Sequence, residues 1–472
     1  MQAVIIAAGN GHRLRRNGNH PKPLHKVAGI SLIERTILSA KKGGIAEFVI
    51  VVGYRAQEIR SRLSRREKGL GVKIEFVENS EWEKGNGFSV LAARSKVTEN
   101  FLLLMSDHLF DWRILPSLLK EKVSPGEVLL GIDPRIQEIF DLPDATKVQT
   151  ENGSIRRIGK EIGNFDAIDT GIFLCSPALF EALETVCRRD GSGLSDGIQF
   201  LASQGKARVF DIGNRYWQDV DTPEGLRHAE KILFQSVRKE TDGVVSRYLN
   251  RYISGFLTRI FLRTPITANQ ITWSALVIGL LSGFLVSRGD WRDVALGGFL
   301  FQLASIYDGC DGEISKLKLT SSKFGEWLDT LCDNTTYIAF FIGVVVGAHR
   351  QGYTYLLPLG VMMVVGVVLF ILAMYYYLLQ YTNSGSLVTV HRELLRDIED
   401  TQQNWFVRWT TKTIFMIKRD FFALAFMFLC FLNRLDLILI LTAIGANSAW
   451  IFLLTIKKEF LLAKVKTEPL ES

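Results

Sequence analysis

Short apolar stretches alternate with charged, helix-like stretches through about the first 245 residues of this chain. The apolar stretches that we predict to be buried strands are 1–9, 47–54, 72–79, 100–108 and 126–133. Helical segments between several of them predict a mostly parallel sheet with helices on both faces, a Rossmann-like α/β arrangement. Around Asn152-Gly153 the sequence TKVQTENGSIRRIG predicts a β-hairpin instead.

Uncharged runs dominate from about residue 265 onward, and this change predicts an all-α transmembrane domain. About 20 apolar residues suffice for a helix to cross a bilayer. Six spans fit the pattern, at roughly 268–287, 291–317, 321–348, 353–380, 417–433 and 436–456.

Between the two halves, residues 231–266 predict interfacial linker helices, with Pro265 ending them. Basic and aromatic residues interleave there, as is typical of a helix on a membrane surface, although an ordinary domain-packing helix is the alternative. The interleaved residues are Arg251, Tyr252, Phe256, Arg259, Phe261 and Arg263. The predicted domains are therefore 1–230, the linker 231–266, the membrane domain 267–460 and a tail 461–472.

Basic residues concentrate on one side of the predicted spans, and positively charged loops stay in the cytosol. The basic side holds Lys316, Lys318, Lys323, Arg392, Arg396, Arg408, Lys412, Lys418, Arg419, Lys457, Lys458, Lys464 and Lys466, with the linker arginines. The opposite loops hold only Arg288, Arg292, Arg350 and Arg434. We therefore expect a multi-pass protein of the cell membrane with both termini in the cytoplasm. The start MQAVIIAAG lacks the basic region of a signal peptide, which agrees.

Charge and cysteine usage narrow the functional classes further. The net charge of +7 comes without a basic, aromatic-interleaved stretch, so we expect no nucleic-acid partner. The five cysteines form no CxxC or zinc-type spacing and are predicted to be free thiols in a reducing cytosol.

A glycine-rich turn follows the first predicted strand, in the sequence AAGNGHRL. It contains Ala8, Gly9 and Gly11 but lacks the third glycine of a dinucleotide fingerprint, and Arg13 stands nearby with Lys22 following. Backbone amides that wrap phosphates, beside two cations, suit a nucleoside triphosphate. A tight strand-to-helix turn is the alternative.

Aspartates end two later predicted strands. Asp107 closes LLLMSDH, and Asp219 and Asp221 lie in YWQDVDTPEG. In α/β sheets ligands bind at strand ends, and two such carboxylates can hold one Mg²⁺ (or Mn²⁺) that bridges phosphate oxygens. A strand-end cap is the alternative for each aspartate alone.

These motifs together resemble those of the sugar-phosphate nucleotidyltransferases. The similarity covers about residues 1–230 in family order, through AAGNGHRL, PKPL, SDH, GNGFSVLAA, DTGIF and WQDVDTPE. It implies that a sugar or polyol phosphate attacks the α-phosphorus of a nucleoside triphosphate and that pyrophosphate leaves. By position, Arg13 and Lys22 stabilise the phosphates, and Asp107 and Asp219 hold the metal. The implied nucleotide pocket includes Asn86, Gly87 and Ser89, and the implied acceptor site includes Lys160 and Asp169.

Four aspartates mark the border between the second and third predicted spans, in DGCDGEISKLKLTSSKFGEWLDTLCD. Asp308 and Asp311 are three residues apart and Asp329 and Asp333 are four apart, so each pair shares a helical face. A turn between the spans brings the pairs together. Carboxylates are costly in hydrocarbon and repel one another, and divalent cations remove that cost. Helix caps or ion pairs with nearby lysines explain one or two of these acids, not four.

The same stretch resembles the signature of the CDP-alcohol phosphotransferase family, over about residues 250–460. The matching positions keep every spacing: Asp308, Asp311, Gly312, Gly325, Asp329 and Asp333. The resemblance implies that the first three aspartates bind metal and the CDP diphosphate. Asp333, which closes the metal cluster, is the implied general base that deprotonates an acceptor hydroxyl before CMP leaves.

Two positions depart from that signature. Ser315 replaces an alanine, and Lys316 replaces an arginine that would bind phosphate through two parallel hydrogen bonds. With Gly312 and Gly325, which leave room for close approach, these residues make up the expected CDP-binding surface.

A fusion of these two halves resembles the bifunctional inositol-phosphate cytidylyltransferase/di-myo-inositol-phosphate-phosphate synthases. The implied substrates are CTP, a polyol phosphate and a CDP-alcohol, with Mg²⁺ or Mn²⁺, in the lipid bilayer and with a homodimer through the membrane domain. A phospholipid synthase whose first domain only binds or senses a nucleotide is the alternative.

Overall fold

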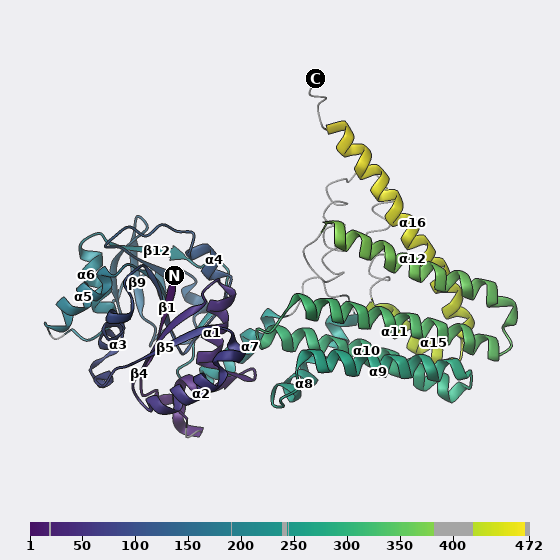
Figure 1. Ribbon diagram of the computed structural model, residues 1–472, viewed down its shortest axis with the longest axis horizontal. Coiled ribbons are helices and arrows are strands. Elements are labelled where there is room, and N and C mark those ends of the chain that lie inside the picture. Colours follow the sequence, from purple (N-terminus) through teal and green to yellow (C-terminus); the bar gives the residue numbers. More distant parts are fainter. Residues whose placement is uncertain (18–19, 190, 238–242, 244, 382–418, 468–472) are drawn as a thin grey trace. The chain divides into compact units, whose positions relative to one another are not determined.

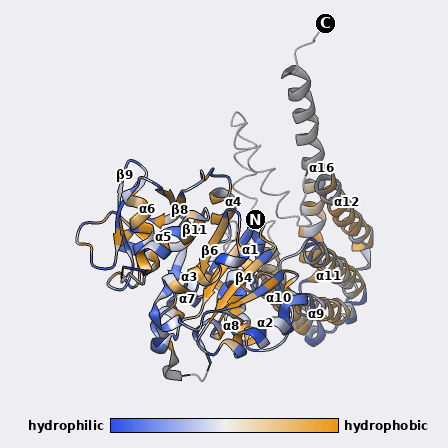
Figure 2. Ribbon diagram, turned by 60° about the vertical axis from the view of Figure 1, so that its left-hand side comes forward, coloured by the Kyte–Doolittle hydropathy of each residue, from blue (hydrophilic) through white to orange (hydrophobic). Residues whose placement is uncertain are grey.

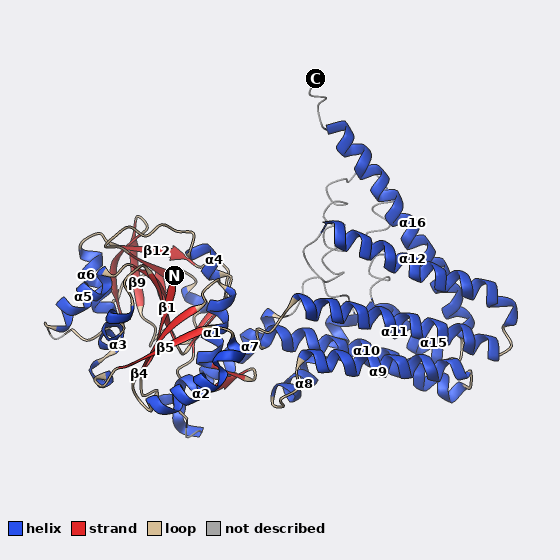
Figure 3. Cartoon of the chain, viewed as in Figure 1, coloured by secondary structure: helices blue, strands red, loops and turns tan. Residues whose placement is uncertain are grey.

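The chain forms two compact units, Met1–Ser236 and Val237–Ser472, in a computed structural model (Figure 1). The structure describes residues 1–17, 20–189, 191–237, 243, 245–381 and 419–467. We call the two parts the N-terminal unit and the C-terminal unit. Strands occur among the described residues of the N-terminal unit, whereas those of the C-terminal unit are helical (Figure 3).

A nine-stranded sheet forms the centre of the N-terminal unit. Across the sheet the strands are β5 (Lys73–Glu78), β4 (Glu47–Val52), β1 (Gln2–Ala7), β6 (Phe101–Met105), β11 (Ala167–Cys175), β8 (Val128–Asp133), β12 (Ala207–Asp211), β10 (Ser154–Gly159) and β9 (Lys147–Glu151). Two small sheets pair β7 (His108–Phe110) with β13 (Trp217–Asp219), and β2 (Lys26–Val27) with β3 (Ile30–Ser31). The five strands predicted from apolar stretches are confirmed.

The expectation of a mostly parallel sheet is wrong, because the sheet is mixed. β1 pairs in parallel with β4 and β6, but β11 runs antiparallel to both β6 and β8. The β9–β10 hairpin adds further antiparallel pairing. In the hairpin a short connection reverses the chain direction, whereas a parallel pair needs a long crossover. The direction of β11 is set by tertiary pairing with strands that are distant in sequence. The hairpin itself is as predicted: Asn152 and Gly153 have φ of 51° and 76°, the left-handed pair of a tight two-residue turn.

Alternate strand residues build two cores, one on each face of the sheet. Val4 and Ile6 belong to one core, and Ala3 and Ile5 belong to the other. The strands β4 and β6 are coloured mostly as hydrophobic in Figure 2. The covering helices are α1 (Leu32–Lys42), α2 (Ala56–Leu70), α3 (Asn86–Ala92), α4 (Ile114–Leu118), α5 (Ala178–Cys187) and α6 (Leu194–Ser203), and α7 (Pro223–Ser236) follows β13. Both faces of the sheet are therefore buried, as an α/β layer structure requires.

Short helical turns complete the described secondary structure. They are η1 (His12–Asn17), η2 (Lys22–Leu24), η3 (Trp82–Lys84), η4 (Arg94–Lys96), η5 (Ile136–Glu138), the π-helical η6 (Ser246–Asn250) and η7 (Thr354–Leu356).

Long helices make up the described part of the C-terminal unit. They are α8 (Arg251–Leu262), α9 (Ala268–Arg288), α10 (Trp291–Leu317), α11 (Lys323–Arg350), α12 (Leu357–Tyr381), α15 (Arg419–Phe431) and α16 (Leu435–Thr467). Thr267 caps α9 through a reciprocal pair of hydrogen bonds with Gln270, and Ser322 caps α11. α9 and α11 cross closely, because a Cβ on Gly343 would lie 2.2 Å from the Gly283 carbonyl oxygen. Such small-residue contacts are typical of helices packed within a membrane.

Three of the described helical segments are long and apolar enough to cross a membrane, Ala268–Arg288, Lys323–Arg350 and Thr354–Tyr376. Two shorter apolar helices span Asp420–Phe431 and Leu435–Ile451. The count of six spans stays a prediction. Much of the predicted connection between spans four and five lies outside the described residues, as do tail residues 468–472.

Candidate functional site

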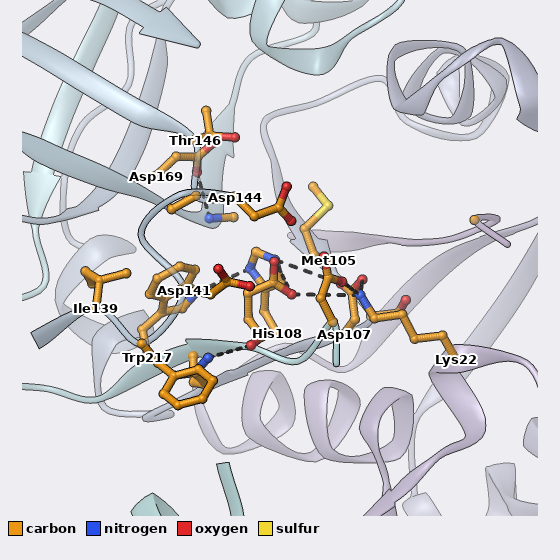
Figure 4. A pocket seen from close by; sticks show the side chains of 18 of the residues that line it. Lys22, Met105, Asp107, His108, Ile139, Asp141, Asp144, Thr146, Asp169 and Trp217 are labelled. Atoms are coloured by element: carbon orange, nitrogen blue, oxygen red, sulfur yellow. Dashed lines mark hydrogen bonds and ion pairs between the residues drawn. The ribbon is translucent and has the colours of Figure 1, made fainter. Parts of the chain in front are cut away.

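A pocket of about 790 Å³ opens in the N-terminal unit beside the carboxyl end of β1. Its wall includes Gly9, Gly11, Arg13, Lys22 and Asp107, so the glycine-rich turn and the predicted phosphate and metal residues face one cavity. Figure 4 shows several of these side chains, with Lys22 pointing toward Asp107. The position agrees with the rule that open α/β sheets bind ligands outside their carboxyl strand ends.

Gly11 allows the glycine-rich turn to pack directly on Lys22. Its φ is +58°, and a Cβ at this position would lie 2.4 Å from the Lys22 Cβ. A side chain here would therefore meet both backbone strain and a clash. At Gly9, by contrast, a Cβ would meet no atom within 4 Å.

Lys22 is 6% exposed and lies among three carboxylates. Its Nζ is 2.5 Å from Asp107 Oδ2 and 3.8 Å from Asp219 Oδ1, and it also forms an ion pair with Asp221. Burial alone would lower the Lys22 pKa, but the surrounding carboxylates outweigh burial and hold that pKa above its usual value. The ammonium is therefore charged at neutral pH. Asp221, which the sequence analysis named only beside the predicted metal ligand Asp219, is the carboxylate closest to the Lys22 ammonium.

Asp107, His108 and Asp219 form a cluster whose ligand atoms all lie within 4.8 Å of one another. The antiparallel pairing of β7 with β13 sets His108 opposite Asp219. Asp219 Oδ1 is buried without a hydrogen bond, and burial raises the pKa of this carboxyl to about 6. A buried carboxylate oxygen without a hydrogen-bond donor suits a divalent cation, because such ions take oxygen ligands.

His108 was not predicted, although it stands within the quoted sequence SDH. Its Nδ1 lies 2.8 Å from the Thr170 carbonyl oxygen and 3.2 Å from Trp217 Nε1. One nitrogen cannot both donate to a carbonyl and accept from an indole, and the shorter contact places the proton on Nδ1. Burial would lower the His108 pKa, but the Asp219 and Asp107 carboxylates raise it. His108 Nε2 lies 3.6 Å from Asp219 Oδ1, so His108 is a third possible ligand beside the two predicted aspartates.

The predicted acceptor residues lie on the same pocket wall. Asp144, which was not predicted, forms ion pairs of 2.7 Å with both Arg13 and Lys160. Burial would raise the Asp144 pKa, but hydrogen bonds from Lys160 and Arg13 lower it to about 2. Asp169 is a buried carboxyl whose pKa burial raises to about 6. No local pattern marks Asp144, because its partners are distant in sequence.

The predicted nucleotide residues divide into two groups. Asn86 and Ser89 line the pocket; Asn86 Oδ1 accepts a hydrogen bond of 2.7 Å from the Leu194 amide, and Ser89 Oγ accepts one of 3.0 Å from Asn79. Ala8 lies in the hydrophobic core, and the Gly87 amide donates to the Ser192 carbonyl oxygen at 3.0 Å. Neither Ala8 nor Gly87 is among the described residues that line the pocket.

In the C-terminal unit Asp308 and Asp311 of α10 come together with Asp329 of α11. Carboxylate oxygens of Asp308, Asp311 and Asp329 all lie within 4.8 Å of one another. Asp329 Oδ1 is buried without a hydrogen bond, and Asp311 accepts one from Thr272. This set of oxygen ligands again fits a divalent cation. Asp333 lies one helical turn beyond Asp329, and the group of three does not include it.

The remaining predicted residues surround this acidic cluster. A Cβ on Gly312 would meet no atom within 4 Å, so the space beside the cluster is open there. Ser315 Oγ donates to the Gly312 carbonyl oxygen at 3.1 Å, and Gly325 follows the Ser322 cap of α11. Lys316 is exposed. One neighbour was missed entirely: Glu313 is buried and hydrogen-bonded to α8.

Two family models match the chain in the same order as these sites. Residues 3–136 match the MobA-like NTP transferase domain, and residues 265–455 match the CDP-alcohol phosphatidyltransferase family. The matched ranges contain the glycine-rich turn and the acidic cluster of α10 and α11, respectively. The chain is thus a transferase with a nucleotidyltransferase domain and a CDP-alcohol phosphotransferase domain.

Curated relatives share both halves. The chain is 36% identical to the bifunctional IPC transferase and DIPP synthase of Rubrobacter xylanophilus, over 74% of this chain and 78% of that protein. It is 34% identical to the protein of that name from Aquifex aeolicus, over 72% and 75%. The solved inositol-1-phosphate CTP transferase of T. maritima is 29% identical with a TM-score of 0.44, covering 49% of this chain and 95% of that chain. The chain belongs to the family of bifunctional IPC transferases and DIPP synthases.

Proposed function

We propose that the protein catalyses two consecutive transfers at two separate sites. In the N-terminal unit, a phosphate oxygen of inositol 1-phosphate attacks the α-phosphorus of CTP, forming CDP-inositol and releasing pyrophosphate. In the C-terminal unit, a hydroxyl of a second inositol phosphate attacks the β-phosphorus of CDP-inositol, and CMP leaves. The product carries one phosphodiester and one phosphomonoester. The observation that carries the proposal is that each of the two units contains its own cluster of converging acidic side chains, and that each unit carries one of the two family-matched ranges.

The N-terminal reaction depends on charge neutralisation and positioning, as phosphoryl-type transfers do. Lys22 and Arg13 would neutralise the triphosphate as negative charge builds up on the leaving pyrophosphate. Lys160, with Asp144 beside it, would receive the phosphate of the acceptor, and Asp169 would orient the polyol hydroxyls. Asn86 and Ser89 would hold the nucleotide on the opposite wall of the pocket.

The acidic clusters are the proposed sites for Mg²⁺ or Mn²⁺. Asp107 and Asp219 would hold the ion in the N-terminal unit, and Asp308, Asp311 and Asp329 would hold it in the C-terminal unit. The ion would supply positive charge that offsets the phosphate oxygens. Support comes from the orphaned buried oxygens of Asp219 and Asp329.

In the C-terminal reaction Asp333 would take the proton from the attacking hydroxyl. It neighbours the acidic cluster along one helix without belonging to the group of three. A general base needs a free lone pair within reach of the hydroxyl, and a carboxylate engaged by metal offers less of one. Gly312 and Gly325 would leave space for CDP, with Ser315 and Lys316 beside it.

The proposal includes a multi-pass membrane position with both termini in the cytoplasm and a homodimer through the membrane domain. Three apolar helices and the basic bias of the loops support the membrane position. On α9 large side chains such as Trp273, Val277 and Phe284 are exposed, at 54%, 64% and 61%. Apolar surface of this kind suits lipid or a second copy of the chain.

Product analysis tests the proposal. Membranes containing the protein receive [α-³²P]CTP and ¹⁴C-labelled inositol 1-phosphate, and both labels are followed through aqueous and lipid extracts. We expect ³²P to pass through CDP-inositol into CMP and ¹⁴C to collect in a water-soluble phosphodiester. A ¹⁴C product in the lipid extract would favour the phospholipid synthase instead, and no CDP-inositol would refute the first step.

A further inference from the structure

Glu313 is a buried carboxylate that the proposed reactions do not use. It is 5% exposed and lies two residues beyond Asp311 on α10. Three donors surround it: Arg251 Nη1 at 2.8 Å, Ser254 Oγ at 2.9 Å and Thr258 Oγ1 at 2.7 Å. We call these four residues the Glu313 clasp. These partners offset the cost of burying the Glu313 charge, and removing either Glu313 or Arg251 would leave the other charge buried and unpaired.

All three donors come from one face of α8, at positions i, i+3 and i+7. Arg251 is therefore not part of a basic surface on the membrane, as the sequence suggested, because its side chain is only 14% exposed and pairs with Glu313. The exposed face of α8 is mostly apolar, with Tyr252, Phe256 and Ile260 at 74%, 62% and 45% exposure, and it also carries Arg259. The helix thus turns Arg251, Ser254 and Thr258 into the protein.

The clasp and the acidic cluster occupy opposite sides of the same turns of α10. Residues two apart on a helix point about 200° apart, so Asp311 and Glu313 face different neighbours. Asp311 is directed to Thr272 and the carboxylate cluster, whereas Glu313 is directed to α8. Cys310 adds a contact to α8 through the Ser254 carbonyl oxygen at 3.6 Å.

We infer that Glu313 is a positioning residue for the C-terminal transfer, fixing the α10 turn that presents Asp308 and Asp311 to the metal and CDP. The inference rests on the proposed metal-dependent function of that cluster. Three neighbouring carboxylates repel one another, so the turn that carries two of them needs an anchor on its other side. Groups that orient metal ligands typically contribute about 10- to 100-fold to metal affinity.

The test compares Glu313→Gln with Gln302→Leu in the full chain. Gln302 also joins α10 to the segment before α8, through a buried hydrogen bond of 3.0 Å to Asn250, but it precedes Asp308 by more than one helical turn. We expect Glu313→Gln to raise the Mg²⁺ concentration for half-maximal transfer by about tenfold. Cytidylylation by the same chain stays unchanged and reports the concentration of the protein and the folding of its N-terminal unit, and the melting temperature reports the folding of the C-terminal unit. Gln302→Leu is expected to leave the Mg²⁺ requirement of both steps unchanged.

A second measurement is independent of turnover. Mn²⁺ binding is titrated by electron paramagnetic resonance in a chain that carries Asp107→Ala and Asp219→Ala. These two substitutions remove the proposed metal ligands of the N-terminal unit, so the signal reports the C-terminal site. Adding Glu313→Gln should weaken Mn²⁺ binding by about tenfold. Arg251→Lys, which keeps the charge but loses the planar guanidinium, should produce a smaller loss in the same direction and covers the case in which Glu313→Gln does not fold.

The outcomes separate this inference from the function beneath it. The reference chain is the one that carries only Asp107→Ala and Asp219→Ala. If it binds no Mn²⁺ and still transfers inositol phosphate from CDP-inositol without added metal, the proposed metal-dependent function fails. If the reference chain binds Mn²⁺ but Glu313→Gln and Arg251→Lys bind it equally well, Glu313 is only a structural ion pair and the inference is overturned. A fall in melting temperature without a change in metal affinity has the same meaning.

Discussion

The Lys22 ammonium lies 2.5 Å from an Asp107 carboxylate oxygen, although 85 residues separate the two in the chain. The contact joins the turn after β1 to the end of β6. It brings the proposed phosphate-binding cation directly against a proposed metal ligand, which makes the N-terminal site a single electrostatic unit.

Lys22→Ala is therefore expected to abolish CDP-inositol formation while sparing the second transfer. Removing one preorganised charge from a transition state commonly costs about 10²- to 10³-fold in rate. The measurement supplies either CTP with inositol 1-phosphate or purified CDP-inositol to the same membranes. Equal loss of both reactions in folded protein would contradict the assignment of two separate sites.

Gly11→Ala should damage the same reaction through geometry alone. The new methyl would approach the Lys22 Cβ to 2.4 Å at a φ of +58°, so we expect a lower melting temperature and weaker CTP binding. Gly9→Ala is the matched control for stability, because its methyl would meet no atom within 4 Å. Equal melting temperatures for the two variants would show that the turn does not pack on Lys22 as described.

Asp144 forms ion pairs with both Arg13 and Lys160. If these cations bind the substrate phosphate as proposed, Asp144 competes for them, so Asp144→Asn is expected to lower the KM for inositol 1-phosphate. Hydrogen bonds to charged groups contribute about 1.5–3 kcal/mol, which corresponds to about tenfold or more. The control is Asp141→Asn, which changes another carboxylate of the same pocket wall. A rise in KM would mean that Asp144 orients the two cations for substrate.

Asp333→Asn and Asp308→Asn should fail in different ways. The first keeps the shape and hydrogen-bonding capacity of the side chain but loses the proton acceptor, so turnover should fall about 10²-fold or more with CDP-inositol binding retained. The second removes a charge from the group of three and should weaken metal-dependent nucleotide binding. The measurement is a titration of metal-dependent nucleotide binding in both variants. Similar losses of binding would make Asp333 a metal ligand and leave the general base unassigned.

Chelation should stop both reactions, because each proposed site gathers acidic side chains and includes one buried carboxylate oxygen without a hydrogen bond. We expect excess EDTA to abolish CDP-inositol formation and transfer, and Mg²⁺ added beyond the chelator to restore both. Full activity of both reactions in excess EDTA would contradict the proposal that they need a divalent cation.

Local patterns carried much of the prediction. Short apolar runs located β1, β4, β5, β6 and β8 in the sequence, and Asn152-Gly153 specified its own turn. The spacing of Asp308 with Asp311, and of Asp329 with Asp333, placed each pair on one side of a helix before any fold was known. These features depend on backbone periodicity and turn conformation, which neighbouring residues determine.

Tertiary structure decided the features that depend on distant partners. The sheet is mixed because β11 runs antiparallel between β6 and β8, and no short-range pattern states which strands will pair. Asp144 gained its role from Arg13 and Lys160, His108 from Asp219, and Glu313 from three residues of α8. In each case an ordinary charged residue became part of a site only when folding brought its partners within hydrogen-bond or ion-pair distance and removed water, which strengthens the charges that remain.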